Sequence, residues 1–251
     1  MPDFVAVIPA RYASSRLPGK PLAEIGGIPM VVHVARRAKD SGAREVWVAT
    51  DHEAIAAAVE QHGFRAKMTS PGHASGTDRI AEVAAAWPHD TIVVNVQGDE
   101  PLIDPGLISG VASKLTEDQG IDAATACCPL QDWTEMHNPN IVKVVLDRKN
   151  RALYFSRAEI PFGRDAEKNG PLPEGFPAFR HIGIYAYRAG FLGTYAALPQ
   201  AAIERFEALE QLRLLWNGYR IGLIQTDAPH GGVDTPDDLE RVRNFFMEKK
   251  I

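Results

Sequence analysis

Residues 5–20 have the sequence VAVIPARYASSRLPGK, which joins an unbroken apolar run to a long cationic loop. The apolar run at 5–8 predicts a strand that is buried on both faces of a parallel sheet. The loop that follows carries three cations, Arg11, Arg16 and Lys20. Open α/β sheets place ligands beyond the carboxyl ends of their strands, so these cations predict a site for a ligand with several negative charges, most simply a polyphosphate. A solvated basic loop remains the alternative.

Two common phosphate-binding motifs are excluded for this loop. A Walker loop needs a glycine five residues before Gly19 and a Ser or Thr after Lys20, but the chain has Ser14 and Pro21 there. The dinucleotide fingerprint needs three glycines directly after the strand, whereas Gly19 is the only glycine before Gly26. We therefore expect the loop to hold a triphosphate with side-chain cations as well as backbone amides.

Composition limits the class of protein. The chain has 251 residues, of which 45% are hydrophobic, so it can bury a large core as one α/β domain with an insertion or as two domains. A net charge of −5 argues against a general nucleic-acid or anionic-membrane binder. We expect a cytoplasmic protein, since residues 1–3 lead straight into a strand and no apolar run approaches the length of a membrane span.

Helical and strand patterns alternate along most of the chain and predict an α/β fold, a Rossmann-like, mostly parallel sheet flanked by helices. The alternation lapses at 129–180, where the apolar segments 141–147 and 152–157 predict an antiparallel hairpin. We expect 1–128 and 181–251 to form the α/β domain and 129–180 to be an inserted subdomain. Its apolar strands need cover, which predicts a homodimer built through this region. Folding of the hairpin onto its own domain is the alternative.

Acidic residues follow a second predicted buried strand, at 90–96. Asp99 and Glu100 lie just beyond its carboxyl end, with Gln97 beside them. A strand-end aspartate beside a triphosphate suits Mg²⁺, which takes one or two carboxylates and completes its shell with phosphate oxygens and water. Ordinary turn acids before Pro101 are the alternative. Asp234, which precedes a predicted helix at 236–249, could be no more than the N-cap of that helix.

Arg79 lies in the first turn of a helix that Ser75 or Thr77 could cap. A cation is unfavourable at that end of the helix dipole. Arg79 therefore needs an anionic partner, such as Asp78, or a bound ligand.

The strand at 179–188 alternates between two faces. Its polar face carries His181 and Tyr185, which could line a pocket or simply pack. A helix is predicted around 203–216, and it carries Glu210 and Gln211.

Six separated segments together resemble the sugar nucleotidyltransferases. They are IPARYASSRLPGKPL at 8–22, SGTDR at 75–79, NVQGDEP at 95–101, HIGIYAYR at 181–188, FEALEQLR at 206–213 and GVDTPDDL at 232–239. The sequences of these segments are most similar to those of the cytidylyltransferases for 3-deoxy-D-manno-octulosonate (KDO). The resemblance covers nearly the whole chain. The resemblance implies transfer of CMP from CTP to KDO, which yields CMP-KDO and pyrophosphate for lipopolysaccharide synthesis.

The resemblance also implies roles for individual residues. The nucleotide side comprises Arg11, Arg16, Lys20, Ser75, Arg79 and Gln97; the sugar side comprises Gln97, His181, Tyr185, Glu210 and Gln211. Arg157, at the end of the predicted hairpin strand, is a further candidate on the sugar side, since an arginine fork would suit the carboxylate of the sugar acid. Asp99 and Asp234 are implied as ligands of Mg²⁺, and with Arg11 and Lys20 they form the implied catalytic set. No His or Glu stands out as a general base, so a sugar hydroxyl made acidic by Mg²⁺ would be the nucleophile.

Several other functions remain open. Within the family, the sugar acid could instead be sialic acid or an 8-amino analogue of KDO. A metal-dependent glycosyltransferase would also bind a nucleotide-sugar, but its diphosphate leaving group needs fewer than three cations. A non-catalytic nucleotide-binding module would be expected to lack Lys20, Asp99 or Asp234, and all three are present.

Overall fold

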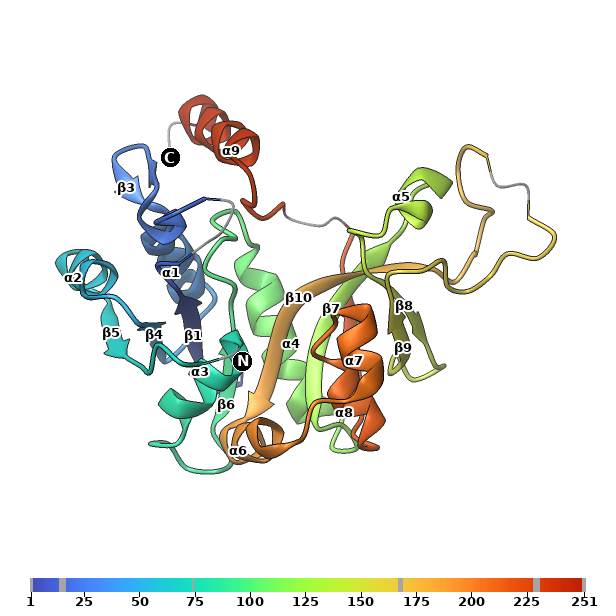
Figure 1. The fold of residues 1–251 in the computed structure, drawn as a ribbon, viewed down its shortest axis with the longest axis horizontal. Coiled ribbons are helices and arrows are strands. Elements are labelled where there is room, and N and C mark those ends of the chain that lie inside the picture. Colours follow the sequence, from blue (N-terminus) through green and yellow to red (C-terminus); the bar gives the residue numbers. More distant parts are fainter. Residues whose placement is uncertain (1, 14–16, 74, 167–168, 228–230, 250–251) are drawn as a thin grey trace.

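One mixed sheet runs through the molecule in the computed structural model, which describes residues 2–249 except 14–16, 74, 167–168 and 228–230 (Figure 1). Its main path has the order β11-β7-β10-β6-β1-β4-β5. These strands are β1 Phe4–Ala10, β4 Glu45–Thr50, β5 Arg65–Met68, β6 Ile92–Asn95, β7 Ala123–Pro129, β10 Phe179–Arg188 and β11 Ile221–Gln225. Neighbours along this path are parallel except that β10 runs antiparallel to both β6 and β7. The predicted α/β class with a mostly parallel sheet is confirmed.

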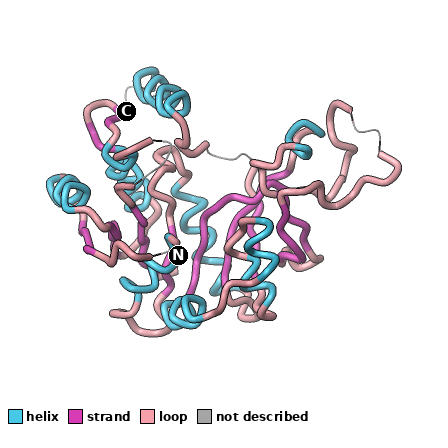
Figure 2. The backbone as a smooth tube through the Cα atoms, in the orientation of Figure 1, coloured by secondary structure: helices cyan, strands magenta, loops and turns pink. Residues whose placement is uncertain are grey.

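Helices cover both faces of this sheet (Figure 2). On one face Phe4, Ala6 and Ile8 of β1 pack in a core with residues of α1 and α4; on the other, Val5 and Val7 pack with residues of α3 and α6. The helices are α1 Met30–Asp40, α2 Glu53–Gln61, α3 Gly76–Ala84, α4 Pro105–Glu117, α5 Trp133–His137, α6 Ala189–Ala197, α7 Ala202–Glu207, α8 Leu212–Trp216 and α9 Pro236–Lys249. The apolar run of β1 is therefore buried on both sides, as its composition predicts.

The predicted hairpin forms from β8 Lys143–Leu146 and β9 Ala152–Ser156. It continues the main sheet, because β8 pairs with the first residues of β10, and Val144 and Phe155 enter the core beside α6. A smaller apolar cluster around Trp133 lies beyond it. The hairpin thus folds back onto its own chain, while the proposed division at 129–180 and the homodimer stay predictions.

One predicted helix is wrong. The segment 203–216 is not continuous, because Ala208 adopts a left-handed conformation (φ 50°, ψ 49°) between α7 and α8. Leu209 in the turn is 5% exposed, so the break lets it reach the core. Glu210 and Gln211 consequently lie in a turn, at the entrance to α8.

The helix α9 packs against residues from the beginning of the chain, which are far from it in the sequence. With the short strands β2 Glu24–Ile25 and β3 Ile28–Pro29 nearby, it buries Leu239, Val242 and Phe246 against Ile25 and Met30. The C-terminal segment therefore lies beside the first α/β unit (Figure 1). Among the described residues, no helix has the combined length and apolar character needed to cross a bilayer.

Candidate active site

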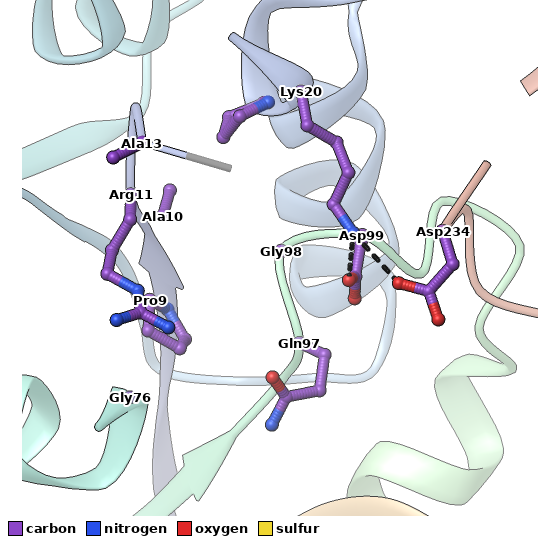
Figure 3. Close-up of a pocket in the computed structure, with 11 residues that line it drawn as sticks. Pro9, Ala10, Arg11, Ala13, Lys20, Gly76, Gln97, Gly98, Asp99 and Asp234 are labelled. Carbon is purple, nitrogen blue, oxygen red and sulfur yellow. Dashed lines mark hydrogen bonds and ion pairs between the residues drawn. The ribbon is translucent and has the colours of Figure 1, made fainter. Parts of the chain in front are cut away.

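A cavity of about 700 Å³ opens beyond the carboxyl ends of β1 and β6 (Figure 3). These strands are parallel neighbours, so both of their carboxyl ends reach the same edge of the sheet. The polar side chains in the lining are Arg11, Lys20, Gln97, Asp99 and Asp234. Gly98 is required there, because a Cβ atom at that position would lie 2.8 Å from the carbonyl oxygen of Pro9. The cationic loop and the strand-end acid therefore meet as predicted.

Lys20 joins two acids that are far apart in the sequence. Its Nζ lies 2.5 Å from Asp99 Oδ2 and 3.4 Å from Asp234 Oδ1 (Figure 3). It also donates to the carbonyl of Val233 at 2.7 Å. Gly19 allows this approach, since its left-handed backbone (φ 68°) begins the short 3-10 helix Lys20–Leu22. One ammonium group therefore stands between two carboxylates.

Asp234 is not the cap of α9, but hydrogen bonds hold the backbone around it. Val233, which is fully buried, donates its N–H to the carbonyl of Asp99 at 2.8 Å. At the start of α9, Thr235 Oγ1 accepts the N–H of Asp238, whose carboxylate accepts the N–H groups of Asp234 and Thr235. Thr235 and Asp238 thus cap the helix, and the Asp234 carboxylate is directed to Lys20.

The two carboxylates fit the predicted Mg²⁺. Among the described residues, no group of three or more His, Cys, Asp or Glu side chains is placed to hold a metal ion. Mg²⁺ bound with phosphates needs only one or two carboxylates, and the ammonium between Asp99 and Asp234 shows that this point attracts a cation. Burial, together with the charge of Asp99, raises the pKa of Glu100 to about 8, so Glu100 adds little negative charge at neutral pH. Asp99 and Asp234 are therefore the acids that could hold Mg²⁺ here.

The predicted nucleotide residues differ in placement. Arg11 lines the cavity with an exposed side chain, and Arg16 lies outside the described residues. Ser75 caps α3 by accepting the N–H of Asp78, and its hydroxyl also donates to Glu210 at 3.0 Å. Its neighbour Gly76 reaches the cavity.

Arg79 does not line the cavity, which corrects its predicted contact with the nucleotide. Its side chain is fully buried, and it donates to Thr69 and, at 2.9 Å, to Asp51. The partner suggested from the sequence, Asp78, is instead engaged in the cap of α3. Arg79 is thus paired with Asp51, which lies at the carboxyl end of β4 and neutralises the charge of the buried arginine.

Asp51 is a residue that sequence reasoning missed at this site. Besides accepting from Arg79, it accepts the N–H of Tyr12, and Tyr12 in turn accepts the N–H of Gly19 through its carbonyl. The carboxylate therefore ties the base of the cationic loop to the sheet. The available signals were an acid directly after a predicted strand and, 28 positions away, a cation at a helix start whose partner was not explained.

The predicted sugar residues gather around β10. His181 shares a 2.9 Å hydrogen bond with Thr125 Oγ1 and contacts the ring of Tyr185, and burial lowers its pKa to about 3. Gln97 donates to the carbonyl of Gly183 on the same strand at 3.2 Å. His181 is consequently neutral at ordinary pH.

Glu210 and Gln211 approach from the α7–α8 turn. Burial raises the pKa of Glu210, and the Ser75 hydroxyl that contacts it partly opposes this shift. Gln211 is 7% exposed. Hydrogen bonds from Gln97 to β10 and from Ser75 to Glu210 thus link the nucleotide side to the sugar side. Arg157 has no such link, because it bonds the carbonyls of Pro139, Glu207 and Ala208.

A family model for cytidylyltransferases matches residues 5–221, which is most of the chain. The chain belongs to the cytidylyltransferase family. It is similar to a solved structure of CMP:2-keto-3-deoxy-manno-octonic acid synthetase complexed with CTP, at 44% identity over 100% of both chains and a TM-score of 0.90. This agrees with the family that the sequence segments indicate.

More distant structures show the same fold only. A cytidylyltransferase from Leptospira borgpetersenii is 18% identical, with a TM-score of 0.64, over 98% of this chain and 87% of that one. The 4-diphosphocytidyl-2C-methyl-D-erythritol synthase from Anaerococcus prevotii is 12% identical, with a TM-score of 0.62, over 98% and 99%. The region matched by the family model ends before Asp234. The position of Asp234 in the site is therefore taken from its contact with Lys20 in this structure.

Proposed function

We propose that this cytidylyltransferase transfers CMP from CTP to KDO and releases pyrophosphate, in a reaction that depends on Mg²⁺. The observation that carries the proposal is the convergence of Lys20 with Asp99 and Asp234 in one cavity. The nucleotide and sugar are supported by the 44% identical synthetase that was solved with CTP. The product would feed lipopolysaccharide synthesis in the cytoplasm.

The chemistry needs positioning and neutralisation of charge more than covalent help from the protein. In the proposed reaction the sugar hydroxyl attacks the α-phosphorus and pyrophosphate leaves on the opposite side. Arg11 and Lys20 hold the triphosphate and offset the charge that develops on the leaving group. Bound between Asp99 and Asp234, Mg²⁺ would neutralise phosphate charge and make a neighbouring hydroxyl more acidic. With a pKa of about 3, His181 is too weak a base for that hydroxyl.

The assay measures pyrophosphate release with Mg²⁺, each nucleoside triphosphate in turn, and KDO, its 8-amino analogue or sialic acid. Turnover should require CTP and be fastest with KDO. Asp99→Asn and Asp234→Asn should each lower turnover about 100-fold or more, because each removes one of two acidic metal ligands. The control is Asp237→Asn, an exposed acid in the first turn of α9 outside the cavity, which should keep wild-type turnover. Full activity of both ligand variants would refute the metal assignment, and a preference for another nucleotide would refute the substrate.

We also propose that the protein is a homodimer. Two large apolar residues within 129–180, Leu153 and Phe162, are 62% and 69% exposed in the single chain. A second copy would cover such residues. Sedimentation should give a dimer mass that Leu153→Asp reduces to a monomer; a wild-type monomer at micromolar concentration would contradict this.

A further inference from the structure

Arg157 stands just past the end of β9 and spans to the turn between α7 and α8. Its Nε donates to the carbonyl of Glu207 at 2.8 Å, its Nη2 to that of Ala208 at 3.4 Å and its Nη1 to that of Pro139 at 3.0 Å. Three guanidinium nitrogens therefore bond the backbone. An arginine that recognised the carboxylate of a sugar acid would instead present two parallel N–H groups to it.

Two of the three carbonyls that Arg157 bonds, those of Glu207 and Ala208, belong to the end of a broken helix. The last carbonyls of a helix have no partner within the helix, and a basic side chain can satisfy them. Here α7 ends at Glu207, and Ala208 turns the chain into a left-handed conformation that alanine adopts only at a cost. The hydrogen bonds from Arg157 to Glu207 and Ala208 stabilise that turn.

The contact between β9 and α7 is reciprocal. The Glu207 carboxylate accepts the N–H of Arg157 at 2.8 Å and the hydroxyl of Ser156 at 2.6 Å. The backbone of Arg157 is also fixed from β8, because the fully buried Lys143 donates to the Arg157 carbonyl at 2.6 Å. The end of β9 and the end of α7 consequently form one clamp, composed of Ser156, Arg157 and Glu207.

The turn held by this clamp carries the predicted sugar-binding pair. Beyond Ala208, the carboxylate of Glu210 accepts from Ser75, and its carbonyl accepts from Tyr195 Oη at 3.0 Å. Glu210 is thus held by hydrogen bonds from Ser75 and Tyr195, and the turn that leads to it is held by the clamp. Loss of the clamp would free the turn while leaving the cationic loop and the two acids in place.

We propose that Arg157 is a positioning residue, which acts through Glu207 and Ala208 to hold Glu210 and Gln211 in place for the sugar acid, and that it does not bind the sugar carboxylate. This inference rests on the proposed CMP transfer to a 2-keto sugar acid. The clamp lies outside the cavity that contains Lys20, so its effect should fall on the sugar and spare the nucleotide.

The first test measures steady-state kinetics with CTP and KDO for Arg157→Ala, Arg157→Lys, Glu207→Ala, Glu207→Gln and the double variant Arg157→Ala/Glu207→Ala. The KM for KDO should rise about 10-fold or more in both alanine variants, while the KM for CTP stays within about twofold. Because the two residues act as one unit, the double variant should be no worse than the more impaired single variant. Arg205→Ala, an exposed arginine on α7, is the matched control and should behave as wild type.

The second test separates positioning from binding of the carboxylate. The ratio of kcat/KM for KDO to that for its carboxamide is measured in the wild type, Arg157→Ala and the milder Arg157→Lys and Glu207→Gln. The ratio should be the same in all four proteins, since the carboxylate is recognised elsewhere. A ratio that collapses in Arg157→Ala, or wild-type kinetics in Glu207→Ala, would overturn the inference. A wild type that releases no pyrophosphate from CTP and KDO would instead refute the proposed function.

Discussion

At the scale of single residues, Lys20 occupies the point between Asp99 and Asp234 where the proposed Mg²⁺ would bind. Its ammonium lies 2.5 Å from Asp99 and 3.4 Å from Asp234, where a cation between two acids is favoured. Without nucleotide, Lys20→Met should therefore bind Mn²⁺ several-fold more tightly than the wild type, measured by the free-ion EPR signal. Its turnover should nevertheless fall about 100-fold or more, because the triphosphate loses a cation.

Asp99→Asn is the control for this prediction and should bind Mn²⁺ more weakly than the wild type. Weaker Mn²⁺ binding by Lys20→Met would mean that the lysine supports the metal site instead of occupying it. The nucleotide-free measurement isolates this point from the role of Lys20 in turnover.

His181 should make the fold sensitive to acid. Burial lowers the folded-state pKa of His181 to about 3, below the ordinary value of 6.5, so the unfolded chain binds more protons between these pH values. Its contribution to stability is fully present above pH 6.5 and is lost as the pH falls toward 3, by at most about 1.4 kcal/mol per pH unit. Urea unfolding at pH 7.5 and pH 5 should show a smaller loss of stability in His181→Gln than in the wild type.

The exposed His89 provides the comparison, since His89→Gln should keep the wild-type pH dependence. Equal losses of stability in the wild type and His181→Gln would show that His181 is charged in the folded protein. The pKa of His181 would then be close to its ordinary value, and the pKa would no longer exclude His181 as the general base.

How far the sequence predicts the site depends on where each residue's partner lies. Lys20 and Asp99 could be placed together because both follow strands whose carboxyl ends share one edge of the sheet. The choice for Arg79 between a ligand and a structural anion could not be made locally. Its partner, Asp51, is 28 positions away, and only the packing of α3 against β4 brings the two together.

At the scale of elements, the close approach of two strand ends makes Gly98 a structural requirement. A Cβ atom there would lie 2.8 Å from the carbonyl oxygen of Pro9, which belongs to β1 and cannot swing aside. Gly98→Ala should lower the free energy of unfolding by about 1–3 kcal/mol and reduce turnover, because the strain displaces the adjacent Asp99. Urea unfolding and the pyrophosphate assay measure the two effects.

Gly193 in α6 is a matched glycine for this experiment. It has open space around its Cβ position and ordinary helical backbone, so Gly193→Ala should raise stability by about 0.5–1 kcal/mol and leave turnover unchanged. Unaltered turnover and stability in Gly98→Ala would show that residue 98 can move away from the Pro9 carbonyl without cost.

Strands and helices of this chain differ in how well local pattern predicts them. The apolar runs of β1 and β6 each indicate a buried strand, and the apolar stripe of α9 indicates a helix. All three elements form as the local pattern predicts. The segment 203–216 has helical periodicity throughout, yet burial of Leu209 and the clamp on Ala208 break it. Tertiary contacts made by residues about 50 positions away override the local preference there.

At the scale of the whole molecule, the class of fold follows from the alternation of elements, but strand order does not. β10 enters the middle of the sheet antiparallel to β6 and β7, and so brings His181 and Tyr185 toward the end of the sheet that bears Gln97. No local pattern specifies that insertion. The sugar side of the site could therefore be named by resemblance, whereas its position beside the nucleotide side required the three-dimensional structure.

The position of Asp234 depends on how α9 docks on the rest of the molecule. Phe246 is 7% exposed and meets the ring of His33 edge-on at 4.5 Å between centroids, while Val233 at the other end of the segment is fully buried. Phe246→Ala should weaken this docking by about 2–4 kcal/mol, and looser docking lets Asp234 move away from Asp99. The Mg²⁺ concentration for half-maximal turnover should then rise several-fold, with much of the maximal turnover retained at saturating Mg²⁺.

Met247, the next residue along α9, tests whether the effect belongs to docking. Its side chain is 67% exposed, so Met247→Ala should leave both stability and the Mg²⁺ requirement unchanged. If Phe246→Ala unfolds more easily but needs no more Mg²⁺ than the wild type, then local contacts such as those with Lys20 and Asp99 hold Asp234 without the docking of α9. If Phe246→Ala needs more Mg²⁺, the C-terminal helix is part of the machinery that sets the second acid of the site.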